Sequence, residues 1–154
     1  MAELVVREAS AAEVLALRMA VLRPGMAVEP GDYDSFADTR HVAAFAGDEV
    51  VGCASVFPAP VPQAPAAWQL RGMAVAADRQ GQGIGALVLR GAIDVVRAAG
   101  APLLWAHARV SALAFYERLG FDVVAGEYLH GPLRLPHKLI LLRLDGAGPP
   151  PARG

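Results

Sequence analysis

The spacing of hydrophobic positions along the chain predicts an alternation of strands and helices. Hydrophobic runs, or hydrophobic residues at every second position, predict strands, whereas recurrence every three or four residues predicts helices. Strands are expected at residues 4–7, 41–46, 49–57, 68–75 and 102–106, followed by a terminal pair at 121–124 and 139–144. Helices are expected at residues 11–23, 84–99 and 110–119, with a short one near 34–39. This order predicts a three-layer α/β fold with a mixed sheet.

Local signals place the ends of several of these elements. Ser10 and Glu13 have the spacing of a capping box, which starts the first helix, and Pro24 stops it. Gly100 suits the left-handed position just past the end of the helix expected at 84–99. Four prolines within residues 58–65 predict an extended loop between two strands.

The helix expected at 84–99 is amphipathic. Its hydrophobic face is expected to carry the residues that recur at helical spacing, namely Leu87, Val88, Ala92, Val95 and Ala99. Its polar face is expected to carry Arg90, Asp94 and Arg97.

Length and composition predict one domain. A chain of 154 residues is long enough to bury a core, so residues 1–144 are expected to form the domain, and the proline- and glycine-rich residues 145–154 a disordered tail. No hydrophobic run approaches the roughly 18 to 20 residues that a membrane helix requires, and the first residues do not resemble an export signal. The single cysteine, Cys53, favours a reducing compartment. We therefore expect a cytoplasmic protein without a membrane partner.

Charge and residue spacing exclude several classes of function. The formal net charge is −1 and no basic block occurs, which argues against nucleic-acid binding. No group of His, Cys, Asp and Glu has the spacing of metal ligands, and no Ser-His-Asp arrangement is legible. The sequence thus predicts neither a metal site nor a serine hydrolase.

A glycine-rich turn connects the strand expected at 68–75 to the helix expected at 84–99. Within it, residues 79–85 read Arg-Gln-Gly-Gln-Gly-Ile-Gly, with glycines at alternate positions. Glycine allows positive φ and a close approach of the backbone to a ligand. The helix amino terminus that follows offers unpaired N–H groups and a positive dipole end. The turn is therefore expected to bind an anion such as phosphate.

Three known phosphate loops compete for this turn. A nucleotidase loop would end in Gly-Lys-Ser or Gly-Lys-Thr, and the dinucleotide fingerprint would read G-x-G-x-x-G; this turn has neither. Residues 80–85 fit the [Arg/Gln]-x-x-Gly-x-[Gly/Ala] signature of the GNAT superfamily of N-acetyltransferases at every fixed position. Residues 70–75 resemble that family's fourth strand, and residues 112–121, which end in Leu-Gly-Phe, resemble its later motif. The resemblance covers roughly residues 3–144.

The resemblance implies a three-layer GNAT-like fold, with a mixed, mostly antiparallel central sheet and helices on both faces. It also implies acetyl-CoA as cofactor, with its pyrophosphate on the amides of the turn and its pantetheine arm along the strand. A strand amide, of Ala74 or Val75, would then face the thioester oxygen. The residues that this resemblance assigns to cofactor binding are Met73, Ala74, Val75, Gln80, Gly81, Gln82, Gly83, Ile84, Gly85, Ala86 and Ser111.

Catalytic candidates follow from the same resemblance. Tyr116 stands where many family members have the tyrosine that protonates the departing thiolate, and a phenol with a pKa of about 10 is protonated at neutral pH. The base is open, because the strand holds Gln69 and Arg71 where many members have a glutamate. His137, expected just before the last strand, is the candidate for base or acceptor contact; His107 and a water chain are alternatives.

The expected activity is transfer of acetyl from acetyl-CoA directly to a primary amine of a small molecule or peptide. The alternative is a non-catalytic acyl-CoA-binding or sensor module with the same fold; a nucleotide-binding regulator is less consistent with the loop spacing. The sequence does not identify the acceptor. The acidic residues between 29 and 38 form either a solvated connection or contacts to a cationic acceptor. Relatives suggest a homodimer.

Overall fold

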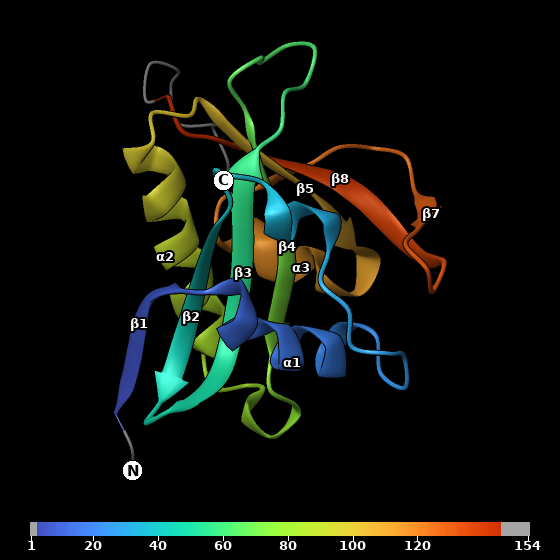
Figure 1. Cartoon of the computed structure of the whole chain (residues 1–154). Coiled ribbons are helices and arrows are strands. Elements are labelled where there is room, and N and C mark those ends of the chain that lie inside the picture. Colours follow the sequence, from blue (N-terminus) through green and yellow to red (C-terminus); the bar gives the residue numbers. More distant parts are fainter. Residues whose placement is uncertain (1–2, 146–154) are drawn as a thin grey trace. The chain divides into compact units, whose positions relative to one another are not determined.

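The computed structural model of the protein describes residues 3–145. In these residues the strands β1 to β8 are Leu4–Ala9, Arg40–Ala46, Glu49–Pro58, Trp68–Val75, Leu103–Arg109, Asp122–Val123, Tyr128–His130 and Leu135–Arg143 (Figure 1). The α-helices α1 to α3 are Ala11–Leu22, Ile84–Ala98 and Leu113–Arg118, and the 3-10 turns η1 to η3 are Asp32–Ser35, Ala77–Arg79 and Val110–Ala112. Of the tail predicted at 145–154, all but Asp145 lies outside the described residues.

The strands are hydrogen-bonded in the order β1-β2-β3-β4-β5-β8-β6, with β7 beside β8. The pairs β1–β2, β2–β3, β5–β8, β6–β8 and β7–β8 are antiparallel, and β4–β5 is parallel. The prediction of a mixed, mostly antiparallel sheet is therefore confirmed.

Backbone contacts divide the chain into two compact units. The first unit comprises the chain up to Pro58 together with Leu70–Val95, and the second comprises Ala59–Gln69 and the chain from Val96 onward. Strand β4 begins in the second unit and continues into the first. The prediction of a single domain over residues 1–144 stays a prediction.

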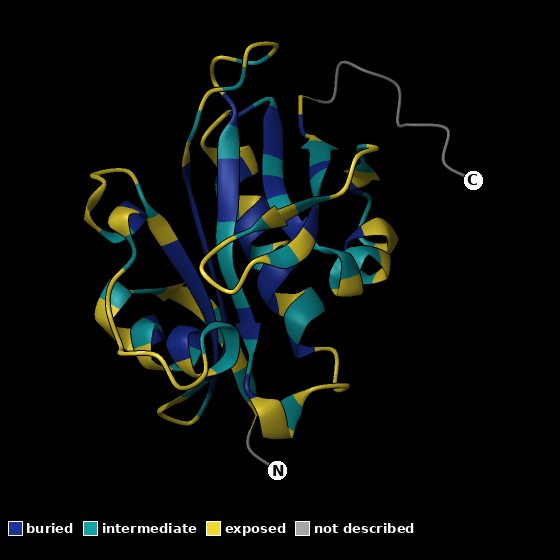
Figure 2. Ribbon diagram, turned by 90° about the vertical axis from the view of Figure 1, so that its right-hand side faces the viewer, coloured by how far each residue is buried: buried dark blue, intermediate teal, exposed yellow. Residues whose placement is uncertain are grey.

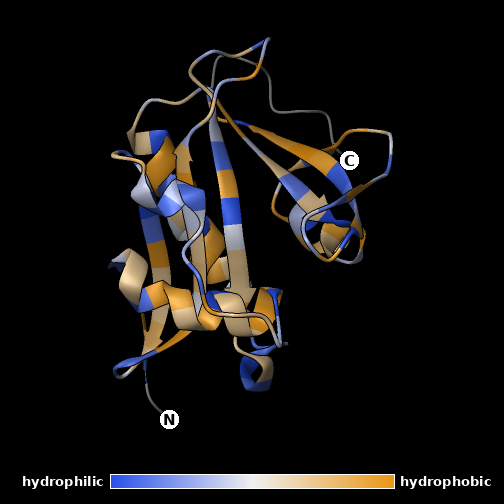
Figure 3. Cartoon of the chain, turned by 45° about the vertical axis from the view of Figure 1, so that its right-hand side comes forward, coloured by the Kyte–Doolittle hydropathy of each residue, from blue (hydrophilic) through white to orange (hydrophobic). Residues whose placement is uncertain are grey.

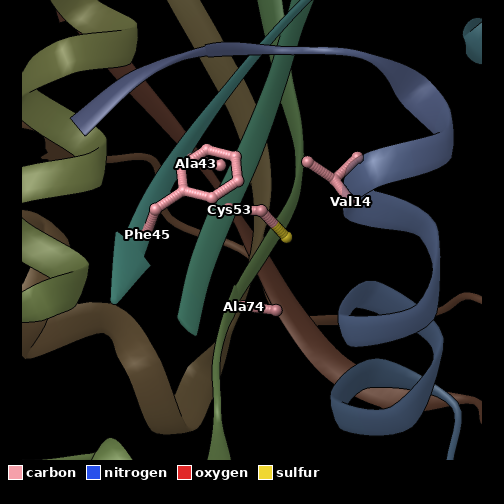
Figure 4. Close-up of a cluster of buried hydrophobic side chains, with 5 residues drawn as sticks. All are labelled: Val14, Ala43, Phe45, Cys53 and Ala74. Carbon is pink, nitrogen blue, oxygen red and sulfur yellow. The ribbon is translucent and has the colours of Figure 1, made fainter. Parts of the chain in front are cut away.

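The strands of the first unit are covered on both faces. On one face lies α2: a Cβ placed on Gly52 of β3 would meet the side chains of Ile84 and Val88 at 2.7 and 3.1 Å, so only glycine allows this close approach. On the other face Val14 of α1 packs into a cluster of buried side chains; its other members are Ala43, Phe45, Cys53 and Ala74 (Figure 4).

Burial on both faces explains the sequence of β2 and β3. Most residues of these two strands are buried, and both read as nearly continuous hydrophobic runs instead of alternating (Figure 2). The prediction of strands from such runs is confirmed, and β4 has the predicted bounds, Trp68–Val75.

Helix α1 starts as the capping box predicts. The Ser10 hydroxyl accepts a hydrogen bond from the Glu13 amide at 3.1 Å, and the Glu13 carboxylate accepts one from the Ser10 amide at 2.8 Å. The helix buries Val14 and Met19, as the hydrophobic spacing indicates. It also buries Arg18, which is only 4% exposed and which the sequence analysis did not single out.

The buried face of α2 was predicted only in part. Val88 and Ala92 are buried, but Leu87 and Ala99 are exposed and Val95 is half-buried. The buried stripe is instead rotated by about one residue; its members are Ile84, Val88, Leu89, Ala92, Ile93 and Val96. Several hydrophobic side chains surround the helix, so periodicity alone did not fix which of them face the sheet. Gly100 has φ +82° after the helix end, as predicted.

The second unit is built around β8. Strand β5 pairs with its residues 137–143, and β6 and β7 pair with shorter stretches of it. Helix α3 is followed by Leu119, by Gly120, whose φ is +101°, and by Phe121, which is fully buried against the Tyr116 ring. The Leu-Gly-Phe end of the predicted helix is thus present.

Three predicted elements differ from the structure. The short helix expected near 34–39 is a 3-10 turn at Asp32–Ser35. The helix expected at 110–119 consists of η3 followed by α3. The last strand starts at Leu135 instead of 139, so His137 lies inside β8 and not before it, and β7 was missed because three residues carry too little pattern.

Candidate active site

The glycine-rich turn leads from η2 into α2 within the first unit. Gly81 and Gly83 have φ of +81° and +80°, and nothing lies within 4 Å of a Cβ placed on either. Both are exposed, and the turn between β4 and α2 is largely hydrophilic (Figure 3). The left-handed backbone explains the glycines, and the open space leaves room for a ligand beside the backbone.

The amino terminus of α2 follows at once. Its first helical hydrogen bond runs from the Leu87 amide to the Gly83 carbonyl at 3.3 Å. The amides of Ile84, Gly85 and Ala86 therefore precede the first hydrogen-bonded turn and point out of the helix end. Together with the helix dipole they make an anion-binding site.

Gln80 links this turn back to β4. Its side-chain amide donates to the Val75 carbonyl at 3.2 Å. This contact fixes the turn relative to the strand end, so the side chain of Gln80 has a structural partner. In the described chain, pairing of β4 with β5 covers only Trp68 and Gln69, so β5 does not engage the backbone of Met73 to Val75. Met73 and Val75 are half-buried, whereas Ala74 faces the hydrophobic cluster.

Tyr116 lies in α3 of the second unit. Its side chain is buried between the rings of Phe115 and Phe121, at centroid distances of 5.1 and 5.5 Å. Burial raises the pKa of Tyr116, and the nearby Arg109 guanidinium lowers it by a smaller amount. Ser111 lies in η3 and is exposed; the residue at the cap position of α3 is Ala112, without a side-chain cap, so Ser111 does not cap this helix.

Three of the four histidines of the chain meet in the second unit. His107 of β5 stacks on His130 of β7 at 4.1 Å between ring centroids, and His130 meets His137 of β8 edge to face at 5.1 Å. Tyr128, which the sequence analysis missed, places its hydroxyl 2.7 Å from His107 Nδ1. The register explains the meeting, because His107 and His130 lie opposite Leu139 and Leu135 of β8, each two residues from His137 and therefore on the same face.

The hydrogen bond of His137 assigns its tautomer. Nδ1 lies 2.7 Å from the Leu135 carbonyl oxygen, which can only accept, so Nδ1 carries the proton. Nε2 of the neutral ring is then left with its lone pair, as a base requires. The ring is buried, with 7% exposure.

Polar side chains of the first unit gather at Tyr33. Arg18 forms a bidentate ion pair with Asp34 at 2.7 and 3.0 Å, both side chains being at least nine-tenths buried. The guanidinium carbons of Arg18 and Arg71 lie 4.9 and 4.7 Å from the Tyr33 ring centroid. The sequence signal was weak: an arginine on the hydrophobic side of α1 and aspartates in a connection.

Strand β4 bends at Gly72 to meet this group. Gly72 has φ +68°, and a Cβ placed on it would lie 3.0 Å from both Arg18 Nε and the Tyr33 hydroxyl. Arg18 Nε is buried and has no hydrogen-bond partner in the described chain. Arg71, the preceding residue, pairs with the exposed Asp32 only at 3.5 Å and keeps 35% of its side chain exposed.

The structure therefore brings the predicted residues together in two groups. In the first unit the residues of β4 and of the turn, Met73 to Ala86, are joined through Gln80. In the second unit His107, His130 and His137 form one cluster; Tyr116 and Ser111 belong to the same unit, in α3 and η3. Among residues 3–145, no three His, Cys, Asp or Glu side chains are arranged to hold a metal ion, and none of the helices has the length and hydrophobicity to span a bilayer.

Comparison with known proteins identifies the family. The model of the acetyltransferase (GNAT) family matches residues 13–121. The chain belongs to this family, whose members transfer acyl groups from acyl-CoA to amine acceptors. It is thus an acetyltransferase of the GNAT family.

Solved structures share the fold. Escherichia coli ElaA superposes with a TM-score of 0.77 at 16% identity, over 92% of this chain and 100% of ElaA. An aminoglycoside 6'-N-acetyltransferase solved with coenzyme A gives 0.69 at 17% identity, over 91% of this chain and 97% of that one. The yncA protein of Salmonella typhimurium, solved with its cofactor acetyl-CoA, gives 0.73 at 20% identity, over 97% and 99% of the two chains. These similarities confirm the GNAT fold.

Proposed function

We propose that this enzyme transfers an acetyl group from acetyl-CoA directly to a primary amine whose molecule also carries an anionic group. The observation that carries the donor assignment is the open, left-handed glycine turn in front of α2. Its two glycines leave the space that a phosphate needs, and the amides of Ile84 to Ala86, which precede the first helical hydrogen bond, supply donors. Two solved relatives of the same fold contain coenzyme A or acetyl-CoA, which supports this choice of anion.

The same residues would hold the donor in place. The amides from Gly81 to Ala86 would bind the pyrophosphate, and the backbone of Met73 to Val75, which β5 does not engage, would bind the pantetheine arm as an added strand would. Bound acetyl-CoA supplies an activated thioester. An amide of Ala74 or Val75 aimed at its oxygen would contribute about 10²–10³ in rate, as donors in a dry site do.

Tyr116 is the proposed general acid. Burial keeps its phenol protonated at neutral pH, which is the state that can donate to a thiolate. The same burial makes the phenol a weaker acid, and the Arg109 guanidinium acts in the opposite direction by favouring the phenolate. We expect Tyr116 to deliver its proton as charge develops on the sulfur and not before.

His137 is the proposed base. An alkyl ammonium with a pKa near 10 must lose a proton before its nitrogen attacks. In the neutral form of His137, Nε2 holds the lone pair, because Nδ1 donates its proton to the Leu135 carbonyl. A covalent acetyl-enzyme is not part of the mechanism, because burial raises the pKa of the single cysteine, Cys53, to about 11 and the thiol is 1% exposed.

The acceptor class follows from the charges beside β4. Asp34 is one of the acidic residues for which contact with a cationic acceptor was an open alternative, and it is paired with Arg18. Arg71 is half-buried against the Tyr33 ring, and within residues 3–145 its ion pair is with exposed Asp32 at 3.5 Å, which is long. Pairs of this kind contribute about 0–1 kcal/mol. Arg71 is therefore available for a carboxylate, which it can bind in bidentate geometry.

Position along the strand limits the size of such an acceptor. Arg71 precedes Met73 by two residues in β4, so an anionic group bound by Arg71 would lie near the strand segment proposed for the pantetheine arm. A compact acceptor would suit this arrangement, with its amine and its carboxylate on the same small molecule or peptide terminus. We infer that the acceptor is an amino acid, or a molecule with the same pair of groups, and not a polyamine.

Binding and turnover test these assignments separately. Thermal unfolding with acetyl-CoA, CoA, ATP and NADH in large excess should show stabilisation by the first two alone; about 100 times the dissociation constant adds roughly 2.7 kcal/mol. CoA release should then be measured with glycine, L-alanine and L-aspartate, each paired with its α-carboxamide. Turnover of the acids above the amides supports the acceptor class, and turnover of the amides alone contradicts it. Binding of acetyl-CoA with no turnover of any amine favours the non-catalytic acyl-CoA module.

A further inference from the structure

Four buried side chains of the first unit form a closed ring of polar contacts. Arg18 donates to Asp34 twice, at 2.7 and 3.0 Å, and to the Ser55 hydroxyl at 3.2 Å. The Ser55 hydroxyl lies 2.7 Å from His41 Nδ1, and His41 Nε2 lies 3.7 Å from Asp34. All four side chains are more than nine-tenths buried. They come from α1, η1, β2 and β3, so the ring ties η1 to the sheet and to α1.

The direction of each hydrogen bond can be assigned. Ser55 accepts from Arg18, so its own proton is free to go to His41 Nδ1. The proton of a neutral His41 is then on Nε2, facing the Asp34 carboxylate. Burial lowers the pKa of His41, which keeps it neutral. Burial alone would raise the pKa of Asp34, but the hydrogen bonds from Arg18 and from the Gly31 amide lower it overall. The ring therefore holds one cation, one anion and two neutral groups.

Stability alone does not account for this ring. Removing an ion pair from water costs several kcal/mol per ion, and well-packed hydrophobic residues of similar volume are often as stable or more so. A buried, hydrogen-bonded ion pair is directional, whereas a hydrophobic contact is not. The ion pair therefore fixes the distances and the angles between the groups that it joins. The question is which group needs that accuracy.

The ring of polar contacts fixes the position of Tyr33. Asp34 is its neighbour in η1, and the Tyr33 ring stacks on Phe57 at 5.2 Å with an angle of 12° between the planes. The Tyr33 hydroxyl then stands against the bend of β4, where a Cβ on Gly72 would lie 3.0 Å away. The face of the Tyr33 aromatic ring supports the Arg71 guanidinium, whose carbon lies 4.7 Å from the ring centroid. A shift of η1 by about 1 Å would move both the hydroxyl and the support of Arg71.

We propose that the four residues of this polar ring, Arg18, Asp34, His41 and Ser55, are positioning residues of the acceptor site. They hold Tyr33 in place, so that the Tyr33 side chain orients Arg71 beside β4. This role rests on the proposed function, in which Arg71 binds the anionic group of the acceptor. Ser55 and His41 act through the ring of polar contacts and need not contact the acceptor.

Two variants separate positioning from stability. The double variant Arg18→Met with Asp34→Leu replaces the ion pair by hydrophobic side chains and leaves no charge unpaired. Ser55→Ala removes one hydroxyl of the ring and no residue that would contact the acceptor. Arg40→Gln is the matched control, because it breaks another bidentate pair, with Glu8, whose side chains are nearly half exposed. The probe is the amino acid, among glycine, L-alanine and L-aspartate, that the wild type acetylates with the highest kcat/KM.

The expected result is a split between the two substrates. In the double variant and in Ser55→Ala the KM for the amino acid should rise about tenfold or more, since misplacements of about 1 Å can cost 10²-fold. The KM for acetyl-CoA should stay within twofold, and Arg40→Gln should change neither. If the double variant does not fold, Ser55→Ala decides. An unchanged amino-acid KM in the folded variants overturns the positioning role alone, whereas a wild type that neither binds acetyl-CoA nor acetylates any probe overturns the proposed function and this role with it.

Discussion

The bend of β4 at Gly72 gives a prediction whose size can be worked out from the structure. The change is Gly72→Ala. Gly72 has φ +68°, where an L-residue is strained by about 1–2 kcal/mol, and an added Cβ would lie 3.0 Å from Arg18 Nε and from the Tyr33 hydroxyl. Two costs are therefore expected, one from the backbone and one from the contacts.

Gly47→Ala separates the two costs. Gly47 lies between β2 and β3 with φ +62°, and nothing lies within 4 Å of a Cβ placed on it. Its substitution carries the backbone strain alone, offset by about 0.4–1 kcal/mol because alanine restricts the unfolded chain. Gly47→Ala should therefore cost about 0.5–1 kcal/mol. Gly72→Ala adds overpacking of about 1–3 kcal/mol, for a sum of about 1.5–4 kcal/mol.

Calorimetry and kinetics measure both consequences. At about 2–4 °C per kcal/mol, Gly72→Ala should lower Tm by about 3–16 °C and Gly47→Ala by about 1–4 °C. Because the added methyl group pushes against Tyr33 and Arg18, Gly72→Ala should also raise the acceptor KM, whereas Gly47→Ala should not. Equal losses of stability in the two variants, with an unchanged acceptor KM, would refute the close approach at Gly72 and the reasoning built on it.

Three further predictions concern single side chains. Tyr116→Phe should lower kcat by about 10²–10⁴ while acetyl-CoA still stabilises the fold, with Tyr128→Phe as the matched control; equal loss in both variants would contradict the role of Tyr116 as acid. The pKa of buried His41 is lowered in the fold, so its contribution to stability is complete above the unfolded pKa of about 6.5 and is lost as pH falls from there toward the folded pKa. Urea unfolding between pH 7 and 5 should thus show a steeper fall in the wild type than in His41→Asn, by at most about 1.4 kcal/mol per pH unit, and parallel slopes would argue against a buried neutral His41. Cys53 should resist thiol reagents at pH 8 in the native protein and react after unfolding, because burial raises its pKa to about 11; rapid native labelling would show that it is accessible.

The sequence by itself determined the order of elements and predicted the donor side of the proposed site. Strands, helices, the Ser10–Glu13 capping box and the left-handed position of Gly100 follow from local rules, because the groups that decide them are within a few residues of one another. The same holds for the glycine turn at 81–85. Backbone conformation and a helix amino terminus are local properties, so an anion site could be predicted there from the sequence.

Only the tertiary structure decided the contacts on which the proposed acceptor side rests. Arg18 and Asp34 are 16 residues apart, and Arg18 and Ser55 are 37 apart, so neither contact leaves a spacing that a sequence pattern would show. The meeting of His107, His130 and His137 likewise depends on the pairing of β5 and β7 with β8, including a three-residue strand that has no periodicity to detect. Buried polar side chains are placed by strand register and by the need to satisfy hydrogen bonds away from water, and both are settled only when the elements pack.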